Sequence, residues 1–250
     1  MYWKAILLTA LTENYAEYQE FAKVLRRYYY LNWIAGFTLT KIKQTSFNLI
    51  KWIKEKKPLI EIENELNKNL IQNSTVSRAV DNLNGEIYFD KWSKPLLFMI
   101  EYNQSDDSNL NFLPVSDRNI HSEHIIPRAY YDKEEWSLFR NDEKIADWIN
   151  TGANLTLLSG AKNISASNEG FGKKLIAYNG KGNYNNEKDG VTSFQITQKI
   201  VNDYHSKIYN GEWNWESITD RWNWFCIEVE KLLEIDLTVI KEKKSGDGLI

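Results

Sequence analysis

Apolar residues spaced three and four positions apart run through most of this chain, and they constrain its fold more than any other feature. Two such runs lie between residues 15 and 57, separated by Gly36, and a third occupies residues 216–234. This spacing places the apolar side chains on one face of a helix. The sequence therefore predicts a mainly helical protein. The apolar positions are Tyr18, Phe21, Val24, Leu25, Tyr28 and Tyr29, then Phe47, Ile50 and Ile53, and finally Trp222, Phe225, Val229 and Leu232.

Proline and capping residues predict where further helices begin. Pro58 opens one helix, Asn73 or Ser74 caps a short second one, and Pro95 lies near the first turn of a third. Another amphipathic helix is expected at about residues 192–209. The polar stretch QSDDSNLNF at 104–112 is the clearest linker signal. We therefore expect a helical domain over residues 1–110 and a second domain, ending in helices, over residues 111–250.

Two short segments differ in amino-acid composition from the predicted helices. NIHSEHII at residues 119–126 is rich in branched residues, and NLTLLS at residues 154–159 resembles it. Such segments favour strands. A helix is expected to start near Ala161. The predicted fold class is mainly α with a small β-hairpin, in which strand, long loop, strand and helix follow one another.

Composition excludes several classes of protein. The formal net charge of -3 argues against histone-like binding of nucleic acid, although basic runs within residues 22–57 leave room for a local basic surface. The lone Cys226 rules out an internal disulfide framework and a cysteine-rich zinc site, which suits a reducing cytoplasm. No stretch reaches about twenty apolar residues, so no membrane span is predicted. We expect a cytoplasmic protein.

The stretch HSEHIIP at residues 121–127 holds two of the three histidines of the chain. Taken alone, the pair Glu123 and His124 is more typical of a structural contact than of a catalytic site. Asn154 flanks the second strand and Asn163 follows it. An acid–histidine pair, then asparagines on a strand and a helix, is the order that a one-metal phosphodiesterase requires. This order favours a metal-assisted hydrolytic site.

Three segments carry a resemblance to a known family: EHIIP at 123–127, GANLTLLSGAKN at 152–163 and SASNEGFGKKL at 165–175. Together they resemble the HNH, or ββα-metal, endonuclease domain. More narrowly, they are similar to the C-terminal nuclease half of GmrSD-type modification-dependent restriction enzymes. The resemblance is specific over about residues 118–178. The flanking segments are similar to the family only in their general helical character. It implies a ββα-metal core embedded in a helical bundle.

The resemblance also implies a role for each matched residue. His124 would be the general base, a task that suits an imidazole of ordinary pKa near about 6.5. Glu123 and Asn163 would be the two protein ligands of the metal, and Asn154 would bond across the loop and orient His124. Oxygen ligands suit Mg²⁺ or Mn²⁺. Neighbouring strand residues point to opposite faces, so a bulge or strand end must let Glu123 and His124 reach one phosphate.

A lysine two to three turns along the helix of Asn163 would hold a phosphate. Lys173 and Lys174 both qualify, and Lys173 is preferred. Asn163 stands where the family name implies a histidine, so a zinc-type set of histidine ligands is not expected. Two other residues are candidates for substrate contacts but also have a non-functional interpretation. His121 is either a solvated strand residue or a DNA contact, and Arg128 is either a surface residue or a phosphate contact. His205 is expected to be structural.

The implied function is a divalent-metal-dependent DNA endonuclease that acts in anti-phage restriction of foreign or modified DNA. Its expected partners are duplex DNA and a nucleotide-hydrolysing half, because the Asp-Gly-Gln-Gln-Arg-like signature of that half does not occur here. The chain would then be a separate nuclease subunit or a C-terminal portion. One metal centre cuts one strand, so an oligomer is compatible with double-strand breaks. The alternative is a catalytically idle module that binds DNA or a partner in a defence complex.

Overall fold

The computed structural model describes residues 2–104, 119–160, 163, 166, 168–179, 194–206 and 212–237, without the side chains of residues 205 and 206. The chain divides into two compact units. The first comprises Met1–Leu83 and Leu233–Ile235, and the second comprises Asn84–Leu232 and Asp236–Ile250. The expected linker at residues 104–112 and the glycine- and asparagine-rich segment at 180–190 lie almost wholly outside the described residues.

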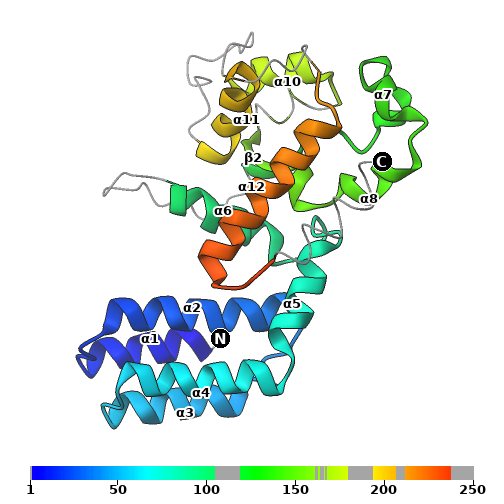
Figure 1. Cartoon of the computed structure of the whole chain (residues 1–250). Helices are drawn as coiled ribbons and strands as arrows, with labels where there is room; N and C mark the ends of the chain where they lie inside the picture. Colours follow the sequence, from blue (N-terminus) through cyan, green and yellow to red (C-terminus); the bar gives the residue numbers. More distant parts are fainter. Residues whose placement is uncertain are drawn as a thin grey trace. The chain divides into compact units, whose positions relative to one another are not determined.

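The first unit is helical (Figure 1). Helix α1 packs on α3, α2 packs on α4, and a helix break at Gly36 has the positive φ of 76° that suits glycine. The predicted break and the helix that follows Pro58 are both present. The apolar stripes of these helices form the core of the unit, as Phe21, Leu25, Leu49 and Ile62 show. The helices are α1 (Tyr2–Thr12), α2 (Tyr18–Ile34), α3 (Lys43–Lys54), α4 (Leu59–Gln72) and α5 (Thr75–Asn84), whose last residue begins the second unit.

The second unit contains a two-stranded antiparallel sheet surrounded by helices. Strand β1 (Ile120–His124) pairs with β2 (Leu155–Ser159), so that Ile120 faces Ser159 and His124 faces Leu155. The predicted fold class, mainly α with a small pair of strands, is confirmed. The principal helices are α6 (Ser93–Gln104), α10 (Phe171–Tyr178), α11 (Gln195–Ser206) and α12 (Trp215–Leu233). Among the described residues, no helix combines the length and apolarity needed to cross a membrane.

A long connection, residues 125–154, separates the two strands and is called the excursion below. It contains several short helical elements. These are η1 (Tyr130–Asp132), η2 (Glu134–Trp136), α7 (Ser137–Arg140), η3 (Glu143–Ile145), α8 (Ala146–Ile149) and η4 (Gly152–Asn154). Trp136, Phe139 and Ile145 are buried and give the excursion apolar anchors. The excursion returns the chain to the sheet at Asn154, directly beside the end of β1.

The boundary between the units falls between Leu83 and Asn84, earlier than the expected position near residue 110. Helix α6 packs against α11 and β2, and therefore belongs with the sheet. The buried carboxylate of Glu101 on α6 accepts hydrogen bonds from the backbone N–H groups of Gln195 and Ile196, at 2.9 and 3.0 Å. These N–H groups begin α11 and have no partner within the helix, so Glu101 caps it.

The helix expected near Ala161 does not continue through the lysines. Gly160, Asn163 and Ala166 have helical backbone, but residues 168–170 are not helical and α10 begins anew at Phe171. Gly170 lies so close to η2 that a Cβ built on it would stand 2.7 Å from the Cβ of Glu135. The prediction that Lys173 and Lys174 lie two to three turns along the helix of Asn163 is therefore wrong. Both lie in the first turn of α10.

Gly152 lets the chain approach α12 closely just before the second strand. A Cβ at this position would lie 2.4 Å from the ring of Phe225, which is fully buried. Only glycine leaves room for the ring. Gly172 on α10 is the opposite case, because a Cβ there would have nothing within 4 Å.

We expect Gly152→Ala to lower the free energy of unfolding by about 1–3 kcal/mol, the usual cost of overpacking a core. Gly172→Ala, the matched control, should raise it by up to about 1 kcal/mol, because alanine is the better helix former. Urea denaturation of both variants measures the difference. Equal stability of the two would contradict the close packing of Gly152 on Phe225.

Candidate functional site

Glu123 and His124 end the first strand, and both are buried, with exposed fractions of 7 % and 8 %. In the sheet Glu123 faces Thr156 and His124 faces Leu155. Neighbouring side chains of a strand point to opposite faces, and these two have different partners. Glu123 accepts a hydrogen bond from a lysine of α10, whereas His124 contacts residues of the excursion and of the segment before α6.

Lys174 compensates the buried charge of Glu123. Its side chain is fully buried, and its ammonium group donates to Oε1 of Glu123 and, at 2.7 Å, to the backbone carbonyl of His124. Burial raises the pKa of Glu123 and lowers the pKa of Lys174, while their mutual attraction opposes both shifts. One lysine thus binds the side chain of one site residue and the backbone of the next.

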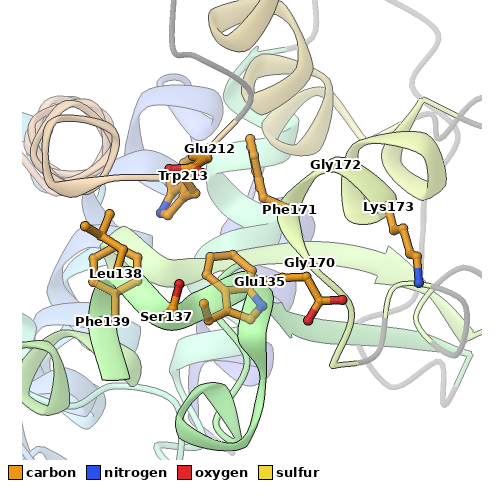
Figure 2. Close-up of a pocket in the computed structure, with 11 residues that line it drawn as sticks. Glu135, Ser137, Leu138, Phe139, Gly170, Phe171, Gly172, Lys173, Glu212 and Trp213 are labelled. Carbon is orange, nitrogen blue, oxygen red and sulfur yellow. The ribbon is translucent and has the colours of Figure 1, made fainter. Parts of the chain in front are cut away.

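Lys173, the preferred phosphate ligand, points elsewhere. Its side chain is 66 % exposed, and its ammonium group pairs with Glu169 at 2.8 Å. Figure 2 shows this side chain extending away from the aromatic residues labelled near it. Of the two lysines that the sequence offered, the structure brings Lys174 and not Lys173 to Glu123 and His124.

The imidazole of His124 contacts Asn150 and Tyr88. Its Nε2 lies 3.1 Å from Oδ1 of Asn150, and its ring lies 4.2 Å from the ring of Tyr88, measured between centroids. Burial lowers the pKa of His124 to about 4; the bond to Asn150 raises it, and the charges of Lys174 and Arg128 lower it. The imidazole is therefore neutral near pH 7, which is the form that can accept a proton.

Asn154 fastens the chain that follows His124. Its amide is 1 % exposed; Oδ1 accepts from the N–H of Ile126 at 2.7 Å, and Nδ2 donates to the carbonyls of Ile126 and Ile149 at 2.9 Å each. These bonds cross the loop, as expected. Their partners are backbone groups, however, and the amide that bonds to His124 is that of Asn150, which the sequence reasoning did not single out.

Asn163 has an unusual environment for an amide. Its Oδ1 is buried and lacks a hydrogen-bond partner among the described residues. Leaving such an oxygen unpaired is costly, so it marks a position suited to a missing donor or cation. Amide and carboxylate oxygens, such as those of Asn163 and Glu123, are of the kind that Mg²⁺ or Mn²⁺ prefers. Within the described ranges, no cluster of three or more His, Cys, Asp and Glu residues could hold a metal.

The family of the chain follows from a comparison with protein-family profiles. The profile described as "GmrSD restriction endonucleases, C-terminal domain" matches residues 74–226, more than half of the chain. The chain belongs to this family. Comparison with curated proteins and with solved structures found no significant match.

The part that matches the GmrSD family includes the whole site. It starts just before α5, covers both strands and ends within α12. All of the buried contacts of Glu123, His124, Asn154 and Lys174 therefore lie inside the family domain. Membership assigns the chain a restriction-endonuclease-like role, for which the substrate is DNA.

Other candidates lie on or near the surface of the GmrSD domain. His121 is exposed on β1, and the guanidinium of exposed Arg128 lies over the ring of Phe89, at 5.3 Å from its centroid. The side chain of His205 is outside the described residues. The basic runs of α2 and α3 belong to the first unit, where Arg27 donates to the carbonyl of Leu233 and to Asn67.

A cavity of about 330 Å³ lies at the start of α10, and Figure 2 shows residues that line it. Trp136, Phe139, Phe171 and Trp213 form its aromatic walls, and the rings of Phe171 and Trp213 are 4.9 Å apart. Neither Glu123 nor any asparagine of the site lines it. The cavity is therefore distinct from the cluster around His124.

We expect Lys174→Met to lower the free energy of unfolding by about 3–5 kcal/mol, because it leaves the buried carboxylate of Glu123 without its partner. The double variant Glu123→Gln with Lys174→Met should regain much of this loss. Lys173→Met is the matched control and should leave stability nearly unchanged, since its ion pair is exposed. Denaturant unfolding of the four proteins tests this. A similar effect of the two lysine substitutions would refute the burial of Lys174.

Proposed function

We propose that this domain is an HNH endonuclease that uses Mg²⁺ or Mn²⁺ to hydrolyse phosphodiester bonds of duplex DNA, in restriction of foreign or modified DNA. Membership of the GmrSD family supports the nuclease role. The observation that carries the finer proposal is the position of the buried imidazole of His124 next to Glu123 at the end of β1, where burial lowers the pKa of His124. A neutral base and an oxygen ligand are the two groups such a reaction needs from the protein.

His124 would take a proton from the attacking water through the ring nitrogen that bears a lone pair. Burial keeps the imidazole neutral before the substrate arrives. The negative charge of the bound phosphate then favours the imidazolium that proton transfer creates. Glu123 and Asn163 would hold the metal, which supplies positive charge at the non-bridging and leaving oxygens of the phosphate.

Lys174 would act on Glu123 rather than on DNA. Its ammonium group already neutralises the carboxylate and binds the carbonyl of His124, so it keeps the end of β1 in place. The earlier assignment of a phosphate contact to Lys173 receives no support from its surface pair with Glu169. Phosphate contacts would have to come from other cations of the domain, such as exposed Arg128.

One observation favours the alternative of a catalytically idle module. The buried pair of Glu123 and Lys174 is satisfied without a metal, as a purely structural pair would be. In this alternative the domain binds DNA or a partner of a defence complex, such as a nucleotide-hydrolysing half. Our proposal retains that half as a partner and places the complex in the cytoplasm.

We expect the purified chain to convert supercoiled plasmid to nicked circles when Mg²⁺ or Mn²⁺ is present. This nicking should stop when the metal is chelated. His124→Ala should slow nicking by about 10²–10⁴-fold, the contribution of a general base. His121→Ala is the matched control, because it removes an exposed histidine from the same strand, and its rate should stay close to that of the parent.

The outcomes separate the two functions. Metal-dependent nicking that only His124→Ala abolishes supports the nuclease. Equal nicking by the parent and by His124→Ala would exclude His124 as the base. DNA binding without nicking, on both unmodified and modified plasmid and with either metal, would favour the idle module.

A further inference from the structure

Two residues outside the three segments that carry the sequence resemblance (residues 123–127, 152–163 and 165–175) contact the imidazole of His124. Asn150, the C-cap residue that follows α8, presents Oδ1 to Nε2 at 3.1 Å, and the ring of Tyr88 lies against the imidazole at an interplanar angle of 50°. We infer that Asn150 is the positioning residue of the base, fixing which ring nitrogen of His124 carries the proton. This inference rests on the proposed function, in which His124 accepts a proton from water.

The chemistry of the contact determines the tautomer. An amide oxygen has lone pairs and no hydrogen, so it can only accept a hydrogen bond. Nε2 of His124 must therefore carry the proton that points at Asn150. The lone pair then resides on Nδ1, and Nδ1 becomes the only ring nitrogen able to take a proton from water. The reversed amide would donate to Nε2 and select the opposite tautomer, so the inference makes a definite choice.

The backbone of Asn150 places the second neighbour of the imidazole. Its carbonyl accepts from the N–H groups of Ile87 and Tyr88, at 2.8 and 3.1 Å. The same residue thus bonds to the imidazole through its side chain and fixes the ring of Tyr88 through its main chain. Next to it, the carbonyl of Ile149 accepts from Asn154. These backbone bonds do not involve the side chain of Asn150, so replacing that side chain should leave the local fold intact.

Asn141 provides a matched control. It is the C-cap residue after α7, as Asn150 is after α8, and both helices have four residues. The two asparagines have nearly the same backbone angles: φ -108° and ψ 12° for Asn141, φ -101° and ψ 11° for Asn150. Asn141 is exposed. Leucine has almost the shape of asparagine and no acceptor, so Asn150→Leu removes the bond without opening space for water, and Asn141→Leu makes the same change at the surface.

The decisive measurement is the ¹⁵N spectrum of the imidazoles in the full chain, labelled at its three histidines and recorded metal-free near neutral pH. His124→Ala assigns the signals. In the parent we expect His124 to show a protonated Nε2, an unprotonated Nδ1 and a slowly exchanging Nε2 proton. In Asn150→Leu that proton should exchange with water, and the two nitrogen shifts should move toward each other. Asn150→Asp, which keeps an acceptor, should restore the parent pattern, and Asn141→Leu should not disturb it.

Plasmid nicking supplies the second readout. Asn150→Leu should lower kcat by about ten- to a hundredfold, the usual cost of losing an orienting partner, while KM stays near the parent value because Asn150 contacts the base and not DNA. A proton on Nδ1 in the parent, or an unchanged spectrum in Asn150→Leu, would overturn the inference. Failure of the proposed function is recognised separately: His124→Ala would then nick like the parent, whereas the tautomer is read without metal or DNA.

Discussion

The amide of Asn154 is the contact on which the site depends. Its side chain bonds both to the chain leaving β1, at Ile126, and to the end of the excursion, at Ile149. A buried amide that satisfies both backbone groups of one residue fixes the path of the chain there, because any displacement would leave several polar groups unpaired. His124 precedes this anchored segment and Asn150 follows Ile149. Their mutual approach is thus a consequence of Asn154 rather than of the two strands alone.

The two side chains at the end of β1 lie in different electrostatic environments. On one face Glu123 keeps a buried charge because Lys174 lies against it; on the other face His124 stays neutral among Tyr88 and Asn150. A charged acid and a neutral imidazole therefore coexist at adjacent positions of one strand. The alternation of side chains, which at first argues against joint action, keeps the two groups from neutralising each other.

Local patterns in the sequence predicted the local structure well. The helical stripes, the break at Gly36 and both strands follow from spacing and turn chemistry. The contacts of the site do not follow from local patterns, because Asn150 reaches His124 only through the folded excursion, and Lys174 reaches Glu123 from a helix that begins anew at Phe171. One signal was present: Lys174 follows Asn163 by 11 residues, about three turns of a helix, which favours it over Lys173 even on an unbroken helix. The catalytic roles assigned to Glu123, His124, Asn154 and Asn163 stay predictions.

The separation of the strands along the chain has a consequence for biosynthesis. β1 and β2 have five residues each, and residues 125–154 must close between them before they can pair. Closing so long a loop costs entropy that two short strands repay only when the excursion has packed. We therefore expect β1 and β2 to pair late in folding. A nascent chain emerging from the ribosome carries Glu123 and His124 long before the asparagines and Lys174 join them, so the assembled site exists only in the finished domain.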